Sequence, residues 1–413
     1  MLSSFPDRAV QRRAPGVAIA SLLFAATLPR TPASAAEFYV QPIGSIQAEN
    51  DSNIDLQPGP SPEVQGYLVD AAALVTIATP NSSSTLRPRI IYGDYPKDRG
   101  DDHLEGFLDL NSTYKTQLSS ASLIGSFEHE DLFNAEISNA LYDELNPNPS
   151  QVDTGRTING ATRDSVLLYP KYIYSFTPII GAGASGQYQA VRYSTTTDTA
   201  FVDFNYYQAQ AFLQWVYSPR STVSLGAYNS KFDATQFTSR ATSNGATVEL
   251  QSNWTQLFTT DVAVSGQHTS IVDVLPVRLN TDVNTWGATV SALYKLQTSQ
   301  FRLDAGRTIS PWGGGSLYVL DRVQFQYSRT FNTRLTFTGA LIGLKTDGLT
   351  ANISGDNRKY GQVAIDAKWM MTRTFFLQGG YQYGYQKYEY ETDSASNNRV
   401  YIRFGYQGLP LQR

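Results

Sequence analysis

Hydrophobic and polar residues alternate with a period of two along most of the chain. Residues 322–327 alternate in this way, and after a short connection at 328–332 the segment 333–341 does so again. A period of two is that of a β-strand with one hydrophobic and one polar face. So short a connection joins antiparallel neighbours, and the sequence therefore predicts a β-hairpin here.

The same alternating unit recurs from the N-terminal region to the C-terminus, for example at 207–217, 286–296, 363–371 and 375–386. Many of these segments exceed the roughly 5–6 residues of a typical soluble strand, and a tilted strand needs roughly 9–11 residues to cross a bilayer. Short connections alternate with longer polar ones, among them 132–163 and 309–317. This pattern predicts an all-β fold, a transmembrane antiparallel up-and-down β-barrel of about 18 strands (16–18), with short periplasmic turns and long extracellular loops.

Aromatic residues are distributed according to the type of connection. Trp215, Trp254 and Trp369 lie within a few residues of short connections, whereas Trp286 and Trp312 lie beside long ones. Amphipathic rings prefer the two interfaces of a membrane, so this distribution favours two aromatic girdles. The alternative is that these rings form the core of a soluble sandwich.

The first 36 residues have the pattern of a secretory signal. Arg8, Arg12 and Arg13 precede a hydrophobic segment at 16–28, and small residues follow at 34–36. We expect cleavage after Ala36, which leaves 37–413 as a single barrel domain. A membrane anchor is the alternative, but the hydrophobic segment is short for a span.

Composition narrows the possible functions. Charged residues make up 16% of the chain, against roughly 25% in ordinary soluble proteins. Cysteine is absent, only three histidines occur, and the formal net charge is -4. These features disfavour thiolate chemistry, histidine-based metal sites and nucleic-acid binding. No nucleophile motif is recognisable, so we predict that the protein is not an enzyme and has neither a catalytic site, a cofactor nor a bound metal.

Several features together resemble outer-membrane porins of Gram-negative bacteria. They are the signal, the recurring hairpins, turn motifs such as Tyr217-Ser218-Pro219-Arg220, and the alternating aromatic terminal strand Arg399–Gln407. In detail the chain is similar to the β-barrel proteins of exopolysaccharide and surface-export gene clusters. The resemblance implies the cell outer membrane as location, with its lipid and lipopolysaccharide, the barrel-insertion machinery and periplasmic chaperones as partners. It leaves polysaccharide-export proteins and further copies of the chain open as partners.

The polar strand faces should line the lumen of such a barrel. The basic candidates for pore lining are Arg87, Arg89, Lys171, Arg302, Arg307, Arg322, Arg334, Lys368 and Arg403, and the acidic ones are Asp203, Glu249, Asp304 and Asp366. The basic excess predicts a water-filled pore for passive or weakly selective passage of small polar or anionic solutes. Two alternatives stay open: a barrel component of exopolysaccharide export or biosynthesis, and a structural or adhesive barrel. The inner face is expected to carry mostly Gln, Thr, Ser and charged residues, which favours small solutes over a sugar path.

The longest connection, 132–163, is the best candidate for a segment that folds inward and narrows the pore. It carries Glu136, Asp143, Glu144, Asp153, Arg156 and Arg163. The alternative is an exposed surface loop.

Overall fold

The computed structural model describes residues 36–61, 63–95, 103–132, 161–195, 201–234, 239–273, 279–349 and 357–412. By contacts the chain divides into two units, Met1–Ala36 and Glu37–Arg413, and the second unit contains all the strands of the described ranges. The expected signal lies outside the described residues apart from Ala36, so its cleavage stays a prediction.

None of the described residues belongs to a helix that is long and apolar enough to cross a membrane.

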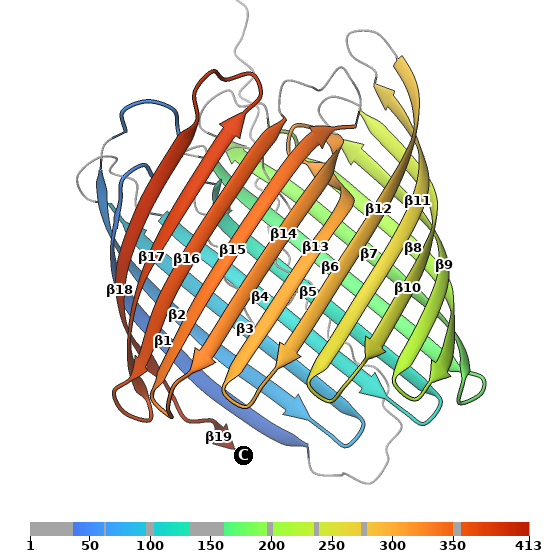
Figure 1. The fold of residues 1–413 in the computed structure, drawn as a ribbon, viewed down its shortest axis with the longest axis horizontal. Coiled ribbons are helices and arrows are strands. Elements are labelled where there is room, and N and C mark those ends of the chain that lie inside the picture. Colours follow the sequence, from blue (N-terminus) through green and yellow to red (C-terminus); the bar gives the residue numbers. More distant parts are fainter. Residues whose placement is uncertain are drawn as a thin grey trace, which may run out of the picture. The chain divides into compact units, whose positions relative to one another are not determined.

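Eighteen long strands make up the described part of the second unit, and a two-residue strand follows them (Figure 1). The strands are β1 (Glu37–Asp51), β2 (Val64–Ala78), β3 (Ser82–Asp94), β4 (His103–Lys115), β5 (Ser119–Asp131), β6 (Ala161–Ser175), β7 (Ile180–Thr195), β8 (Phe204–Ser218), β9 (Ser221–Ala234), β10 (Arg240–Asn253), β11 (Phe258–Asp273), β12 (Leu279–Lys295), β13 (Ser299–Trp312), β14 (Ser316–Thr330), β15 (Leu335–Gly348), β16 (Arg358–Met370), β17 (Phe375–Tyr388), β18 (Ala395–Gln407) and β19 (Leu411–Gln412).

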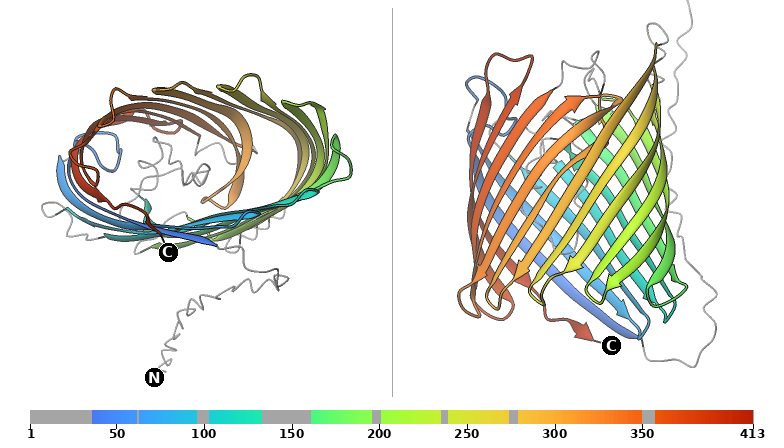
Figure 2. Two further views of the ribbon diagram at one scale, coloured as in Figure 1. Left: turned by 90° about the horizontal axis from the view of Figure 1, so that it is seen from below. Right: turned by 45° about the vertical axis from the view of Figure 1, so that its right-hand side comes forward.

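Each long strand pairs antiparallel with its neighbours in the chain, and β1 also pairs with β18, which closes the sheet into a barrel (Figure 2). The short β19 pairs with Tyr39 and Val40 of β1 beyond the end of β18. The prediction of a closed antiparallel barrel of about 18 strands is therefore confirmed. Closure leaves no free sheet edge around most of the wall, as a bilayer requires of a spanning sheet.

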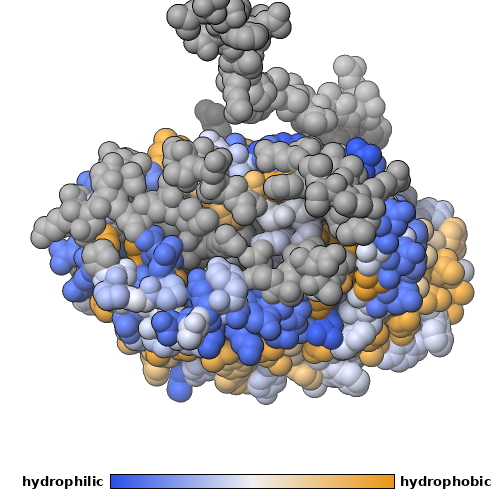
Figure 3. Space-filling model, turned by 90° about the horizontal axis from the view of Figure 1, so that it is seen from above, coloured by the Kyte–Doolittle hydropathy of each residue, from blue (hydrophilic) through white to orange (hydrophobic). Residues whose placement is uncertain are grey.

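Hydrophobic residues cover the outside of the barrel wall. Ile46, Leu104 and Trp286 are each more than half exposed although they lie within strands, and orange hydrophobic surface is visible along the flank in Figure 3. The residues that alternate with the outward hydrophobic residues along each strand point inward, and some of them make polar contacts with neighbouring strands. In a soluble barrel the hydrophobic residues point inward and the polar residues outward. The opposite arrangement seen here identifies the wall as membrane-spanning.

Exposed aromatic residues surround the rim at which the connections are short, which we call the short-turn rim. Trp215 and Tyr217 pack together next to the β8–β9 turn, and Phe375 contacts Phe404 and Tyr406 near the β17 start. This agrees with the predicted girdle on this side.

Three prolines lie within strands at positions where the regular pairing with one neighbouring strand is interrupted. The β2–β3 pairing omits Pro88, and the β6–β7 pairing omits Pro170. Pro42 directly precedes Ile43, the first β1 residue paired with β18. Since proline has no N–H to donate, these interruptions allow the three residues to remain in a closed sheet.

The tip of the β13–β14 hairpin leaves the wall at the opposite rim, which we call the long-connection rim. Pairing of β12 with β13 ends at Ala288 and Arg307, although β13 remains paired with β14 up to Trp312. Figure 2 shows these strands turned toward the interior. Leu317 packs there with Phe204 and Phe232, in a cluster whose buried members are Val191, Val202, Phe204, Tyr206, Phe232, Ala234, Ala241, Ile271, Leu317 and Leu349.

The β1–β2 connection also reaches the inner wall. Leu56 is buried against Ala340, Ile342, Tyr360 and Ala364 of β15 and β16. Its carbonyl oxygen accepts a hydrogen bond from Nε2 of Gln386 on β17, at 3.3 Å. Two described segments therefore pack inside the barrel near the long-connection rim.

Candidate functional site

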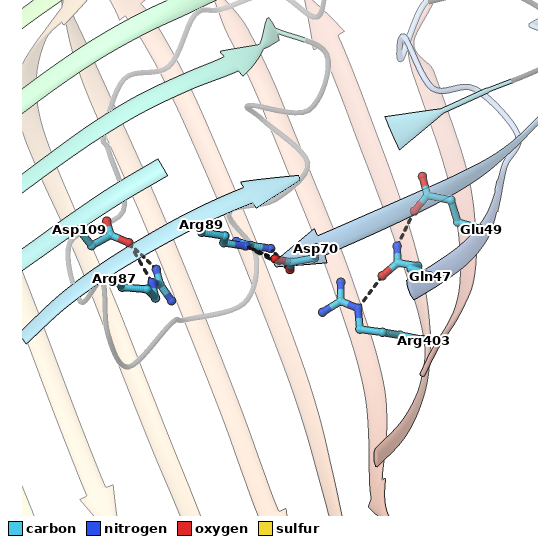
Figure 4. A network of polar contacts seen from close by, with 7 residues as sticks. All are labelled: Gln47, Glu49, Asp70, Arg87, Arg89, Asp109 and Arg403. Carbon is cyan, nitrogen blue, oxygen red and sulfur yellow. Dashed lines mark hydrogen bonds and ion pairs between the residues drawn. The ribbon is translucent and has the colours of Figure 1, made fainter. Parts of the chain in front are cut away.

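A network of charged side chains follows the inner wall across β18 and β1–β4 (Figure 4). Arg87 is paired with Asp109 at 2.6 Å, and Arg89 with Asp70 at 2.7 Å. Arg403 donates from Nε to Oε1 of Gln47, at 2.8 Å. The network therefore places three guanidinium groups, from β3 and β18, along one side of the lumen.

Strand register explains this arrangement. Arg87 and Arg89 are two residues apart on β3, so they point to the same face. Asp109 of β4 lies directly opposite Arg87, while Asp70 of β2 pairs diagonally with Arg89. The Arg87–Asp109 pair is 11% exposed at both side chains, and Arg89 is 29% exposed. Arg89 is thus fixed by its partner and still accessible from the lumen.

The polar surface continues onto β16 and β17. Nζ of Lys368 lies 4.2 Å from the ring centroid of Phe376 and 3.4 Å from Oε1 of Gln407. Asp366 accepts a hydrogen bond from Nε2 of Gln378, at 2.9 Å. The structure therefore places Arg87, Arg89, Lys368, Arg403 and Asp366 on one continuous part of the inner wall, which runs from β16 through β18 and β1 to β3.

Further predicted residues also point inward, on other parts of the wall. Arg302 and Asp304 of β13 form an ion pair at 2.9 Å, and Arg322 of β14 donates to Gln324 at 2.6 Å. Nζ of Lys171 on β6 lies 5.3 Å from the ring centroid of Phe212. Glu249 shares the inward parity of the buried Ser243 on β10.

Arg307 was predicted to line the pore, but the structure places it on the outer face of the barrel. It lies opposite Ala288, and its guanidinium lies 4.9 Å from the ring centroid of the exposed Trp286. Arg302 and Arg307 are five residues apart on one strand, so they cannot point to the same side. Arg307 pairs instead with Asp321 on the outer face of β14, at 2.7 Å.

Two further predicted residues lie outside the strands. Arg334 is in the short turn between β14 and β15, at the rim and not on the inner wall. Asp203 precedes β8, where its Oδ1 accepts a hydrogen bond from the backbone N–H of Tyr193, at 2.9 Å. The alternating pattern extends past both strand ends, which is why the sequence did not separate them from the wall.

Arg163 lies on β6 and not in the preceding connection. Its side chain is buried and forms ion pairs with Glu130 and, at 3.5 Å, with Glu128 of β5. Glu136, Asp143, Glu144, Asp153 and Arg156, the other predicted constriction residues, lie outside the described residues. Their role stays a prediction.

Sequence reasoning missed the aromatic residues of the inner face. Phe107, Phe212, Phe376, Tyr228 and Tyr401 all occupy inward positions, where mainly Gln, Thr, Ser and charged residues were expected. A signal was present, because each ring lies two residues from a polar inward residue, as Phe107 does from Asp109. Several inward cations lie over these rings, including Arg89 at 5.6 Å from the centroid of Phe107.

Within the part of the chain that the structure describes, no three His, Asp or Glu side chains are grouped to hold a metal ion.

No protein-family model matches the chain, and no curated protein sequence matches it. Among solved structures it is similar to OccK2 (OpdF) of Pseudomonas aeruginosa in complex with glucuronate, at 11% identity over 90% of this chain and 98% of that chain, with a TM-score of 0.45. OpdK of Pseudomonas aeruginosa with vanillate shares 11% identity over 92% and 99% of the two chains, with a TM-score of 0.43. A BenF-like porin from Pseudomonas fluorescens shares 9% identity over 90% and 98%, with a TM-score of 0.45. At these values the likeness does not extend to residues of the site.

Proposed function

We propose that the protein forms a water-filled pore for small polar and anionic solutes in the outer membrane. The row formed by Arg87, Arg89 and Arg403 on the inner wall carries this proposal. Basic side chains that line a lumen attract anions and orient polar solutes, and the low-dielectric wall strengthens that effect.

The residues that contact these cations support a weak preference of the pore for anions. Asp109 and Asp70 balance Arg87 and Arg89, whereas Arg403 donates to a neutral amide. Lys368 likewise contacts an aromatic ring and an amide oxygen, and Lys368 and Arg403 share the nearby carboxylate of Asp366. The row therefore carries more positive than negative charge while its members remain held in place.

The outer-membrane placement rests on the closed barrel with its hydrophobic outer wall and on the expected signal. We infer cleavage after Ala36 and a single barrel domain at 37–413. A strand-spanning protein of this kind requires periplasmic chaperones and the barrel-insertion machinery as partners, because its alternating segments cannot insert as helices.

The test is single-channel conductance of the refolded mature chain in a planar bilayer, with reversal potentials in a KCl gradient. We expect stable current steps with mild anion preference, which Arg89→Gln combined with Arg403→Gln abolishes. Arg307→Gln is the matched control, because it removes an arginine from the outer face. A folded barrel that carries no current would contradict the pore and favour a structural or adhesive role.

The same recording tests the proposed constriction by the 132–163 connection. Deleting part of this segment should raise the conductance if it narrows the lumen. Unchanged conductance would assign it to the surface.

A second candidate function is the export of a polysaccharide, and the inward aromatic residues favour it. Tyr228 donates to Gln267 at 2.6 Å, and Tyr401 lies 3.5 Å from the side-chain amide of Gln378. Rings flanked by amides suit stacking with sugars, because each ring offers an apolar face beside hydrogen-bonding groups. Neutral oligosaccharides that block the current from one side would support this function, and Tyr401→Ala should then shorten the block.

A further inference from the structure

Five charged residues form a row across the outer face of β13–β17. The strand registers place Arg307 opposite Asp321, Asp321 opposite Lys345, Lys345 opposite Lys359, and Lys359 opposite Lys387. Residues directly opposite each other on adjacent strands have Cβ atoms about 5 Å apart. The last three members are all lysines, and all three are exposed.

The row lies directly beyond the hydrophobic part of the wall. Leu341, Val363 and Tyr385 share the outward face with Lys345, Lys359 and Lys387 and are each more than a third exposed. In each strand the lysine lies farther from the short-turn rim than its hydrophobic neighbour. The ammonium groups are therefore placed where the hydrophobic wall ends on the long-connection side.

Two of the three lysines are not balanced by an acid. Arg307 is bonded to Asp321, and Nζ of Lys345 lies 2.6 Å from Oδ2 of Asp347. Within the described ranges, neither Lys359 nor Lys387 forms an ion pair. Glu389, two residues beyond Lys387, instead accepts a hydrogen bond from Asn357, at 2.5 Å. Like charges directly opposite each other destabilise a sheet unless an anion lies between them.

The outer wall on the other side of the barrel does not share this feature. At similar positions Asp233 pairs with Arg240 at 3.3 Å, and His129 with Asp164 at 2.6 Å. Ser270 donates to Asp282 at 2.6 Å. Opposite signs or hydrogen-bonding partners alternate at these positions. Lys231 of β9 is also exposed there, but it lies opposite Tyr207 and Thr242 and not opposite another cation. Two lysines that lie directly opposite each other without an acid are therefore a feature of β16 and β17.

We propose that Lys345, Lys359 and Lys387 bind the phosphorylated headgroup of an outer-leaflet lipid. Basic residues at a membrane surface attract anionic headgroups. A lipid is favoured over a free anion because the row adjoins Val363 and Tyr385, against which acyl chains would pack. The proposal rests on the proposed outer-membrane placement and is independent of conduction through the lumen.

The test is the binding of diphosphorylated lipid A to the purified, folded barrel in detergent, followed by native mass spectrometry. Each lysine near an anionic surface contributes about 1 kcal/mol, which corresponds to about fivefold in affinity. We expect Lys359→Gln with Lys387→Gln to weaken binding roughly 25-fold by the same arithmetic. Lys359→Arg with Lys387→Arg should retain it.

Lys231→Gln, an exposed outward lysine on β9, is the matched control and should bind as the unaltered protein does. Equal binding by the double glutamine variant would overturn the proposal, as would equal binding of lipid A lacking its phosphates. Inorganic phosphate that binds as tightly as lipid A would assign the row to free anions. Conductance of the same variants should be unchanged, so that failure of the pore and failure of this site are distinguishable.

Discussion

The two sides of the barrel interior differ in what they bury. On β1–β4 and β16–β18 the inner wall carries ion pairs such as Arg87–Asp109, with charged groups still facing the lumen. On β7–β11 near the long-connection rim, Phe204 and Phe232 are fully buried beneath the β13–β14 hairpin. Hydrophobic groups packed at this density exclude water. We therefore expect solutes to follow the polar side, while the other side fixes the hairpin in place.

The largest effect on stability is expected from a variant that disrupts packing on the hydrophobic side. Phe232→Ala removes a buried ring that packs 5.5 Å from Phe204, centroid to centroid. Such a truncation costs about 3 kcal/mol, so the free energy of unfolding in lipid vesicles should fall by about that amount. Thr242→Ala, on the outer face of β10, should change it little. Equal effects of both variants would show that the cluster does not stabilise the barrel.

The polar side is tested by removing one carboxylate. Asp109→Asn leaves Arg87 largely buried without its acid, and losing one partner of a partly buried pair should cost about 1–2 kcal/mol. The released positive charge should also shift the reversal potential toward greater anion preference. A stable variant with unaltered selectivity would place the pair outside the conducting path.

A smaller effect is expected when one cation of the lumen is neutralised at a more exposed pair, because the Arg89–Asp70 side chains are 29% and 19% exposed, against 11% for both side chains of Arg87–Asp109. Arg89→Gln should lower the anion-to-cation permeability ratio by about twofold, in line with about 0.4 kcal/mol for one screened charge. The measurement is the reversal potential at low salt, and the shift should shrink at high salt. Insensitivity to salt would argue against a direct electrostatic effect.

The smallest effect is expected at the outer face. Arg307→Gln breaks an exposed pair and a contact with Trp286, which together are worth less than about 1 kcal/mol. It should leave both selectivity and conductance unaltered. A shift in reversal potential comparable to that of Arg89→Gln would show that Arg307 faces the lumen.

The strands were predictable because a period of two is a local property of the sequence. The segments 207–217 and 363–371 lie within β8 and largely within β16, as expected. The side of the wall to which a residue points could also be derived. Arg302 and Arg307 are an odd number of positions apart on one strand, so they point to opposite sides. The polar side of the interior could be predicted from the same rule.

The hydrophobic side could not be derived in this way. The Gly-rich segment 309–317 predicts a loop, but in the structure β13 and β14 extend to a tight turn at 313–315, where Gly315 has a φ of +83°. The tip is held by contacts with residues far away in the chain, including the hydrogen bond from the Val202 N–H to the Gly313 carbonyl, at 2.7 Å. A smaller hydrophobic contact on the polar side was hidden for the same reason, because Leu56 packs against β15 and β16, which are far away in the chain. Such packing depends on tertiary partners that no local pattern specifies.

The pairing of β1 with β18 has a consequence for biosynthesis. Gln47 contacts Arg403 across that seam, so the first long strand is synthesised well before β18, the strand that pairs with it. Contacts so distant in sequence form slowly, because the whole intervening chain must be ordered first. Until then every strand exposes its hydrophobic face to water, with unpaired edges that favour aggregation. Closure consequently has to wait until all eighteen long strands are present, and a truncation that removes β18 and β19 should prevent closure however well the other seventeen long strands are made.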